Sequence, residues 1–212
     1  MSTRIGLIGD PHATAAPVAK AVSLLRAEGV DRILCTGDIA GYGNELDETV
    51  DLLIEAGCTA ILGNHESWYL EKSTDRQDTR NRAFFEKLPS VVELNVEGVR
   101  LYMVHASPPR SDMEGIKLLD VRGDVLPESM SAWSERLQGF DYDVLIVGHT
   151  HQVFAERLAD TLVVNPGSTK FNHSCAILDL PSMAFQVLPL SSEKVVKSWN
   201  WGTNQITKNN GA

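Results

Sequence analysis

The sequence predicts an α/β fold, and three observations support this prediction. Short apolar runs alternate with amphipathic helical patterns from residue 5 to residue 62, as in β–α–β units. Helical connections of this kind join parallel strands. Hydrophobic residues make up 43% and charged residues 22% of the 212 residues, which is typical of a globular chain. We therefore expect a single domain over residues 1–198, followed by a loose tail over residues 199–212 that lacks core residues.

The first part of the chain is expected to form three strands and two helices. The strands are the apolar runs at 5–8, 32–36 and 59–62. The first helix places Val18, Val22 and Leu25 on one face, at positions i, i+4 and i+7. The second is expected to begin with Asn44 as its N-cap and to end at Gly57.

The rest of the chain is expected to add seven strands. These are a hairpin of 91–96 and 99–104, then 143–147, 152–158, 161–164, 174–180 and 184–189. Short connections predict mostly antiparallel pairing for the last four. Between 66 and 90 the pattern is weak, and it indicates one helix at 80–87 that ends before Pro89. A polar loop at 107–126 precedes a helix that Pro127 opens and Gly139 follows.

Charge and cysteine content exclude several classes of protein. Nineteen Lys and Arg against 28 Asp and Glu give a net charge of −9, which disfavours broad nucleic-acid binding. The three cysteines are far apart and form no CxxC pair, so neither a disulfide framework nor a thiolate zinc site is expected. The N-terminus lacks a signal-peptide pattern and no apolar run is long enough to span a membrane. We expect a cytoplasmic protein without membrane contact, and the oligomeric state stays open.

Metal-binding residue types follow the expected strands. They are Asp10 and His12 after the first strand, Asp38 after the second, Asn64 and His65 after the third, and His105, His149 and His151 after later strands. Ligand sites in α/β sheets lie at the carboxyl ends of strands, so these residues are expected to converge. Oxygen and nitrogen donors without sulfur suit Mn²⁺, Fe, Zn²⁺, Ni²⁺ or Co²⁺. Of the six histidines, only His173 lies elsewhere in this pattern.

These residues stand in motifs that resemble a known family. The motifs are Asp10-Pro11-His12, Gly37-Asp38, Gly63-Asn64-His65-Glu66, His105, Gly148-His149-Thr150-His151 and the later Asn165-Pro166-Gly167-Ser168. In order and spacing they resemble the calcineurin-like metallophosphoesterase superfamily, in particular its small bacterial and archaeal phosphoesterases. The resemblance implies a four-layer α-β-β-α sandwich of two mixed sheets flanked by helices. The motif of the family's serine/threonine protein phosphatases is absent after Asp38, so that branch is not expected.

The resemblance also implies a role for each site residue. One divalent ion would be held by Asp10, His12, Asp38 and His151, and a second by Asp38, Asn64, His105 and His149. Manganese is favoured over iron, zinc, nickel or cobalt. A hydroxide that bridges the ions would attack the phosphorus of a small-molecule or nucleotide ester. His65 is then the expected catalytic acid toward the leaving group, and Glu66 is expected to orient it.

Several alternatives stay open at the level of sequence. Arg110, Lys170 and His173 are candidate substrate contacts, although such residues in loops are more often solvated at the surface. Trp68 and Tyr69 are candidates for stacking on a substrate ring or for core packing. The loop at 107–126 is either a lid or a surface insertion. The chain is a phosphomonoesterase or a phosphodiesterase, and the alternative from another class is a catalytically silent scaffold or protein-binding module.

Overall fold

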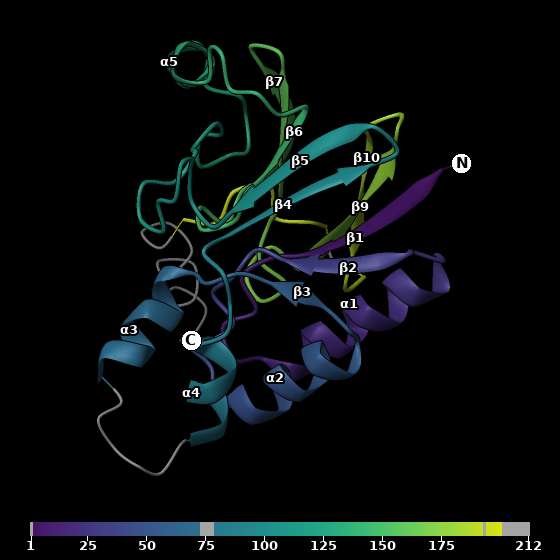
Figure 1. Ribbon diagram of the computed structural model, residues 1–212, viewed down its shortest axis with the longest axis vertical. Helices are drawn as coiled ribbons and strands as arrows, with labels where there is room; N and C mark the ends of the chain where they lie inside the picture. Colours follow the sequence, from purple (N-terminus) through teal and green to yellow (C-terminus); the bar gives the residue numbers. More distant parts are fainter. Residues whose placement is uncertain (1, 73–78, 193, 201–212) are drawn as a thin grey trace.

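The computed structural model describes residues 2–72, 79–192 and 194–200, and it contains two five-stranded sheets (Figure 1). The first sheet has the order β10 (Ala184–Pro189), β9 (Ser174–Leu180), β1 (Thr3–Ile8), β2 (Arg32–Cys35) and β3 (Thr59–Ala60). Strands β1, β2 and β3 are parallel, as predicted from their helical connections, while β9 and β10 are antiparallel. β1 therefore lies in the middle of this sheet, between β2 and β9.

The second sheet is also mixed. Its order is β4 (Val91–Val96), β5 (Val99–Val104), β6 (Val144–Ile146), β8 (Thr161–Pro166) and β7 (Val153–Leu158). The expected antiparallel pairing holds for β8 with β7 and for β9 with β10, and β8 in addition lies parallel to β6 on its other side. The chain leaves β6, forms β7 at the edge of the sheet and returns between the two, so β8 runs in the same direction as β6.

Helices cover the outer faces of both sheets (Figure 1). α1 (Ala15–Ala27), α2 (Leu46–Glu55), α3 (Asn64–Lys72) and α4 (Thr79–Phe85) lie on the side of the first sheet, and α5 (Pro127–Arg136) lies beyond the second. Three apolar clusters separate the layers. Val18 and Leu53 belong to the cluster between helices and first sheet, Leu7 and Met103 to the cluster between the sheets, and Trp133 to the outer one. The predicted four-layer sandwich is confirmed.

The local differences from the sequence-based expectations lie around the second and third strands. The second helix begins at Leu46 with Glu45 in the N-cap position, so the predicted Asn44 cap is wrong. The Glu45 carboxylate instead accepts a hydrogen bond from the Ala15 N–H at 2.9 Å. Strand β3 ends at Ala60 rather than at residue 62. Helix α3 was not expected, because its residues carry polar groups where an apolar repeat would stand.

Within the described residues, no helix combines the length and the apolar character that a membrane crossing requires.

Candidate metal centre

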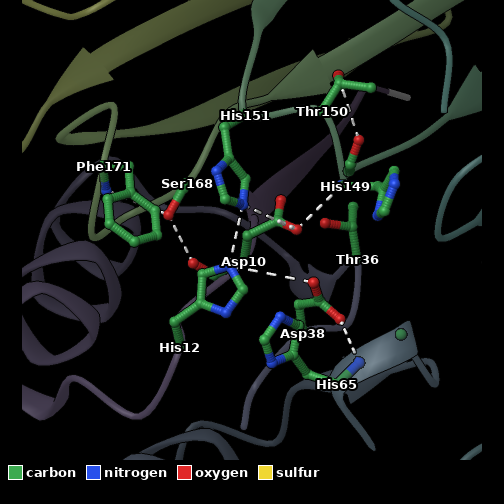
Figure 2. Close-up of polar contacts among 12 residues, drawn as sticks. Asp10, His12, Thr36, Asp38, His65, His149, Thr150, His151, Ser168 and Phe171 are labelled. Carbon is green, nitrogen blue, oxygen red and sulfur yellow. Dashed lines mark hydrogen bonds and ion pairs between the residues drawn. The ribbon is translucent and has the colours of Figure 1, made fainter. Parts of the chain in front are cut away.

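The seven predicted metal-binding residues come together at one edge of the two sheets. Figure 2 shows Asp10, His12, Asp38, His149 and His151 among them. The seven follow β1, β2, β5 and β6 or open α3, and they are Asp10, His12, Asp38, Asn64, His105, His149 and His151. All are buried except His149, which is partly buried. Parallel strands from both sheets end at this edge, so the fold brings together loops that are far apart in the sequence.

One group of donors consists of Asp10, His12 and His151. The Nε2 atoms of His12 and His151 lie 2.9 Å apart, and His151 Nε2 lies 3.9 Å from Asp10 Oδ1. The second carboxylate oxygen of Asp10 is buried and has no hydrogen-bond partner within the described chain. Lone pairs that face one another around an unpartnered carboxylate oxygen fit a bound cation.

A second group consists of Asp38, Asn64, His105 and His149. Asn64 Oδ1 lies 3.1 Å from His105 Nε2 and 2.9 Å from His149 Nδ1. Asp38 Oδ1 lies 3.3 Å from His105 Nε2 in this group, and Asp38 Oδ2 lies 4.0 Å from His12 Nε2 in the first group. The two oxygens of Asp38 therefore face different donor groups. This donor set fits two cations that share one carboxylate.

Backbone carbonyls fix the orientation of two of the imidazole rings. His12 Nδ1 donates to the Ala40 carbonyl at 3.2 Å, and His105 Nδ1 donates to the Thr36 carbonyl at 2.7 Å. In each ring the other nitrogen, Nε2, points into the donor groups and is the atom that would bind a metal once it holds no proton. Outer hydrogen bonds of this kind are usual for metal-binding histidines, because they set the tautomer.

Burial strongly perturbs the charges of the site. Burial raises the pKa of Asp10 to about 8, although His105 opposes this rise. Burial also lowers the pKa of His149 to about 4 and that of His151 to about 3. Burial by itself would raise the pKa of Asp38, but the charge of His105 and its hydrogen bond hold it below its usual range. His149 and His151 are thus neutral, as a metal requires, whereas Asp10 has to lose its proton when a metal binds.

The backbone is strained at five of these residues. Asp10, His12, Asp38, His149 and His151 have φ between 43° and 62°, a left-handed conformation that is uncommon for residues other than glycine, although Asn, Asp and His adopt it more readily than most. Such conformations persist only where the surroundings enforce them, and they cluster at functional sites. The turns after the strands are thus shaped to direct side chains inward.

The late Asn-Pro-Gly-Ser motif supports two of these strained turns. The Ser168 hydroxyl donates to the Asp10 carbonyl at 2.6 Å. The Asn165 amide donates to the Gly148 carbonyl at 2.8 Å and to Thr150 Oγ1 at 3.1 Å. This motif therefore holds the loops of Asp10 and His149 in place through hydrogen bonds.

The sequence suggested that Glu66 orients His65, whereas the hydrogen bonds of the Glu66 side chain in the described chain join it to other residues. The Glu66 side chain is fully buried, and its three hydrogen bonds within the described chain all come from backbone N–H groups. Oε2 accepts from Asp38 at 2.8 Å and from Gly63 at 2.8 Å, and Oε1 accepts from Ala40 at 2.7 Å. Burial raises the pKa of Glu66 to about 7. Its carboxylate ties the loop of Asp38 to the start of α3.

His65 is held at the border of the donor groups. Its ring lies 4.7 Å from the Tyr42 ring and 4.9 Å from the Trp68 ring, measured between centroids. A Cβ atom at Gly41 would collide with His65 Nδ1, so glycine is required there. Burial lowers the pKa of His65, which makes the protonated ring a stronger acid. His65 also forms a possible metal-binding group with His12 and Asp38, so its geometry suits either a proton donor or a ligand.

A cavity of about 570 Å³ opens above the donor groups. Its walls come from the loop at 107–126 and from the segment after β10, and they include Met113, Lys117, Leu119, Asp120, Val121, Ser198, Trp199 and Asn200. The buried Gln152 side chain joins the two walls. Its Oε1 accepts from the N–H groups of Leu118 at 2.8 Å and Leu119 at 3.0 Å, while Nε2 donates to the Leu119 carbonyl at 2.7 Å and to Ser198 Oγ at 3.3 Å. Gln152 therefore holds the loop at 107–126 in place as one wall of the cavity.

Gln152→Ala is expected to lower the free energy of unfolding by about 2–4 kcal/mol, because buried backbone groups lose their partners. Denaturant unfolding measures this change, and faster proteolysis within residues 107–126 is expected to accompany it. Gln138→Ala is the matched control, since the Gln138 side chain is exposed. Equal stability of the two variants would show that Gln152 does not pin the loop.

Most of the predicted substrate contacts do not line the cavity. Arg110, Lys170 and His173 are not among the residues that line it. Trp68 does line it, as one of the sequence alternatives proposed.

Of the predicted tail, the structure describes only residues 199 and 200. The Trp199 N–H donates to the His151 carbonyl at 3.0 Å, and residues 201–212 lie outside the described residues.

Several lining residues were not predicted from the sequence as site residues, and they include Tyr42, Lys117 and Gln152. Gln152 directly follows His151, so its position beside the site was available as a signal. Tyr42 stands between two glycines, which indicated a turn but not its direction.

Comparison with known proteins agrees with this geometry. Residues 3–183 match the model of the calcineurin-like phosphoesterase superfamily domain. The chain is 26% identical to the uncharacterized protein MJ0912 of Methanocaldococcus jannaschii over 184 residues, which cover 79% of this chain and 70% of that protein. It is 22% identical to the phosphodiesterase MJ0936 of the same organism over 164 residues, 77% of this chain and 82% of that protein.

A solved structure supports the fold. The metallophosphoesterase from Sphaerobacter thermophilus superposes with a TM-score of 0.66 at 20% identity, covering 99% of this chain and 95% of that chain. The motifs, the two-sheet sandwich and the match over most of the chain lead to one conclusion. The chain belongs to the calcineurin-like phosphoesterase superfamily.

Proposed function

We propose that this protein is a phosphoester hydrolase that depends on two divalent metal ions and acts on a small-molecule or nucleotide ester. The observation that carries the proposal is the position of Asp38, whose two oxygens face two different donor groups. A single shared carboxylate between two sets of imidazoles is suited to two close cations. The family to which the chain belongs supports the reaction class.

The donors fit metals that accept both oxygen and nitrogen. Asp10, His12, Asp38 and His151 would hold one ion, and Asp38, Asn64, His105 and His149 the other. Manganese is favoured, with iron, zinc, nickel and cobalt as alternatives. When bound, the two ions supply Lewis acidity, which lowers the pKa of water and offsets charge on the phosphoryl oxygens. Two carboxylates against two dications leave a net charge of about +2, which attracts a phosphate ester despite the acidic chain.

The chain's own residues would orient the ester and move a proton. Lys117, at the cavity wall, adds a positive charge near the phosphoryl group. As a water-derived hydroxide would bond to phosphorus, the bond from phosphorus to the leaving oxygen breaks, and its electron pair stays on that oxygen. The His65 imidazolium then gives its proton to the oxygen, and the alcohol departs.

The first experiment removes metal with a chelator and restores Mn²⁺. Turnover of p-nitrophenyl phosphate and of bis-p-nitrophenyl phosphate is then compared, and the preferred ester distinguishes monoesterase from diesterase. We expect turnover only after metal is restored. A chain that binds no metal and hydrolyses neither ester would favour the catalytically silent scaffold. The presence of every donor together with His65 argues for the enzyme.

His65→Ala is expected to lower kcat by on the order of 10²- to 10⁴-fold for an ester with an alkyl leaving group. The loss should be much smaller for p-nitrophenolate, which departs without protonation. Metal content, measured by atomic emission, is expected to stay at the wild-type value. His173→Ala is the matched control, since His173 does not line the cavity. An equal loss for both leaving groups would reject the acid role, and a loss of metal would assign His65 as a ligand.

A further inference from the structure

Helix α3 presents four side chains on one face beside the metal centre. His65, Trp68, Tyr69 and Lys72 occupy positions i, i+3, i+4 and i+7, which lie on the same side of a helix. Together with Tyr42 and the backbone of residues 40 and 41, they line a second hollow of about 390 Å³. The hollow thus has three aromatic walls and one lysine.

The hollow adjoins the metal cavity at His65. Tyr42, His65 and Trp68 line both spaces, so the His65 ring forms the border between them. The Tyr42 and Trp68 rings both lie next to this imidazole, with ring centroids 4.7 Å and 4.9 Å away. A group that leaves the metal cavity past His65 would therefore enter the hollow.

We propose that this hollow binds the leaving group of the ester, and that this group is a planar ring carrying an anionic substituent. The inference rests on the proposed function, because a proton donor at His65 places the leaving oxygen next to that ring. The departing alcohol takes its proton from His65 and keeps the electron pair of the broken bond to phosphorus.

The walls of the hollow suit a planar ring. Trp68 is 39% exposed and Tyr42 is 56% exposed, although both are large aromatic side chains. Tyr69 is fixed from behind by an edge contact with Phe85, whose ring centroid lies 5.3 Å away. Aromatic side chains that are open on one side form stacking platforms for bases and other rings.

The charge of the hollow suits an anion. Lys72 is exposed and lines the hollow at the end of the helix face. No carboxylate is among the described residues that line the hollow. A ring with a phosphate or carboxylate substituent, as in a nucleotide, therefore finds both a stacking surface and a counter-charge.

The test compares three esters that differ only in the leaving group: 4-carboxyphenyl, phenyl and 2,2,2-trifluoroethyl. They are made as methyl phosphodiesters, or as monoesters if the enzyme prefers these. Trp68→Ala is expected to lower kcat/KM by roughly 10- to 100-fold for the two ring esters, and far less for the trifluoroethyl ester. Lys72→Met is expected to lower it by about 2- to 5-fold for the carboxyphenyl ester alone.

Two matched variants separate the hollow from the metal cavity. Met113 and Lys117 line only the cavity, so Met113→Ala should keep the preference for rings, and Lys117→Met should affect all three esters alike. An equal loss for all esters in Trp68→Ala would overturn the proposal.

Binding of 4-hydroxybenzoate, the free leaving group, gives a readout that does not need turnover. Calorimetric titration is expected to detect binding to the metal-loaded wild type and to Met113→Ala, but not to Trp68→Ala. Binding that does not depend on Trp68, or no binding to the wild type, would overturn the proposal. Trp68-dependent binding without hydrolysis of any ester would reject the proposed function, and it would support the hollow as a site for this ring.

Discussion

Asp38→Asn is expected to reduce the metal content below one ion per chain and to lower phosphoesterase activity by on the order of 10³-fold or more. Asp38 alone directs one oxygen at each of the two donor groups, 3.3 Å from His105 Nε2 and 4.0 Å from His12 Nε2. The asparagine side chain keeps one oxygen and replaces the other with an NH₂ group, which carries no lone pair for a metal. Both positions also lose a negative charge.

Metal analysis after gel filtration in Mn²⁺ and the turnover assay measure these two effects. Asp120→Asn is the matched control, because Asp120 lies in the wall of the same cavity but in neither donor group. It should retain the wild-type metal content. Two full equivalents of metal in Asp38→Asn would reject the sharing of this carboxylate.

Glu66→Gln is expected to lower the affinity for metal by about 10- to 100-fold and the free energy of unfolding by about 2–4 kcal/mol. The Glu66 carboxylate accepts three backbone N–H groups with its two oxygens. A glutamine in either orientation turns an NH₂ group toward at least one of these donors, so a buried N–H loses its partner. Because two of the donors belong to Asp38 and Ala40, the loop that carries Asp38 should shift.

Isothermal titration with Mn²⁺ and denaturant unfolding check this prediction. Glu45→Gln is the control, since Glu45 accepts a single N–H group at an exposed position. A Glu66→Gln protein that is less stable but binds Mn²⁺ as tightly as the wild type would restrict Glu66 to a role in stability.

The convergence of the candidate metal-binding residues could be predicted because each follows a strand or opens the helix after one. An apolar run followed by a turn is visible in the sequence, and parallel strands bring such turns to one edge. The order of the motifs then indicated the family, and the match over residues 3–183 confirms it. The role of Glu66 could not be predicted in this way, because its partners are backbone groups, which any residue supplies.

Helix α3 and the second hollow beside it were not predicted from the sequence, for the same physical reason. The apolar periodicity that marks a helix reflects packing against a core, whereas the face of α3 that carries Trp68 and Lys72 borders a hollow. The i, i+3, i+4, i+7 relation of these residues becomes visible only once the segment is known to be helical. Gln152 joins two walls that are distant in sequence, and local patterns do not report such contacts.

The central place of β1 has a consequence for the order in which a nascent chain can fold. Ile5 pairs with Arg32 in β2 on one side and with Leu178 in β9 on the other. On the ribosome, β1 can pair with β9 only after residues 174–180 have been synthesised. The hydrogen bond from Ser168 to Asp10 can form only slightly earlier. Nascent chains that stop short of β9 are therefore expected to leave the turn of Asp10 and His12 unsupported. Metal binding would then be expected only once the chain has been synthesised to β9.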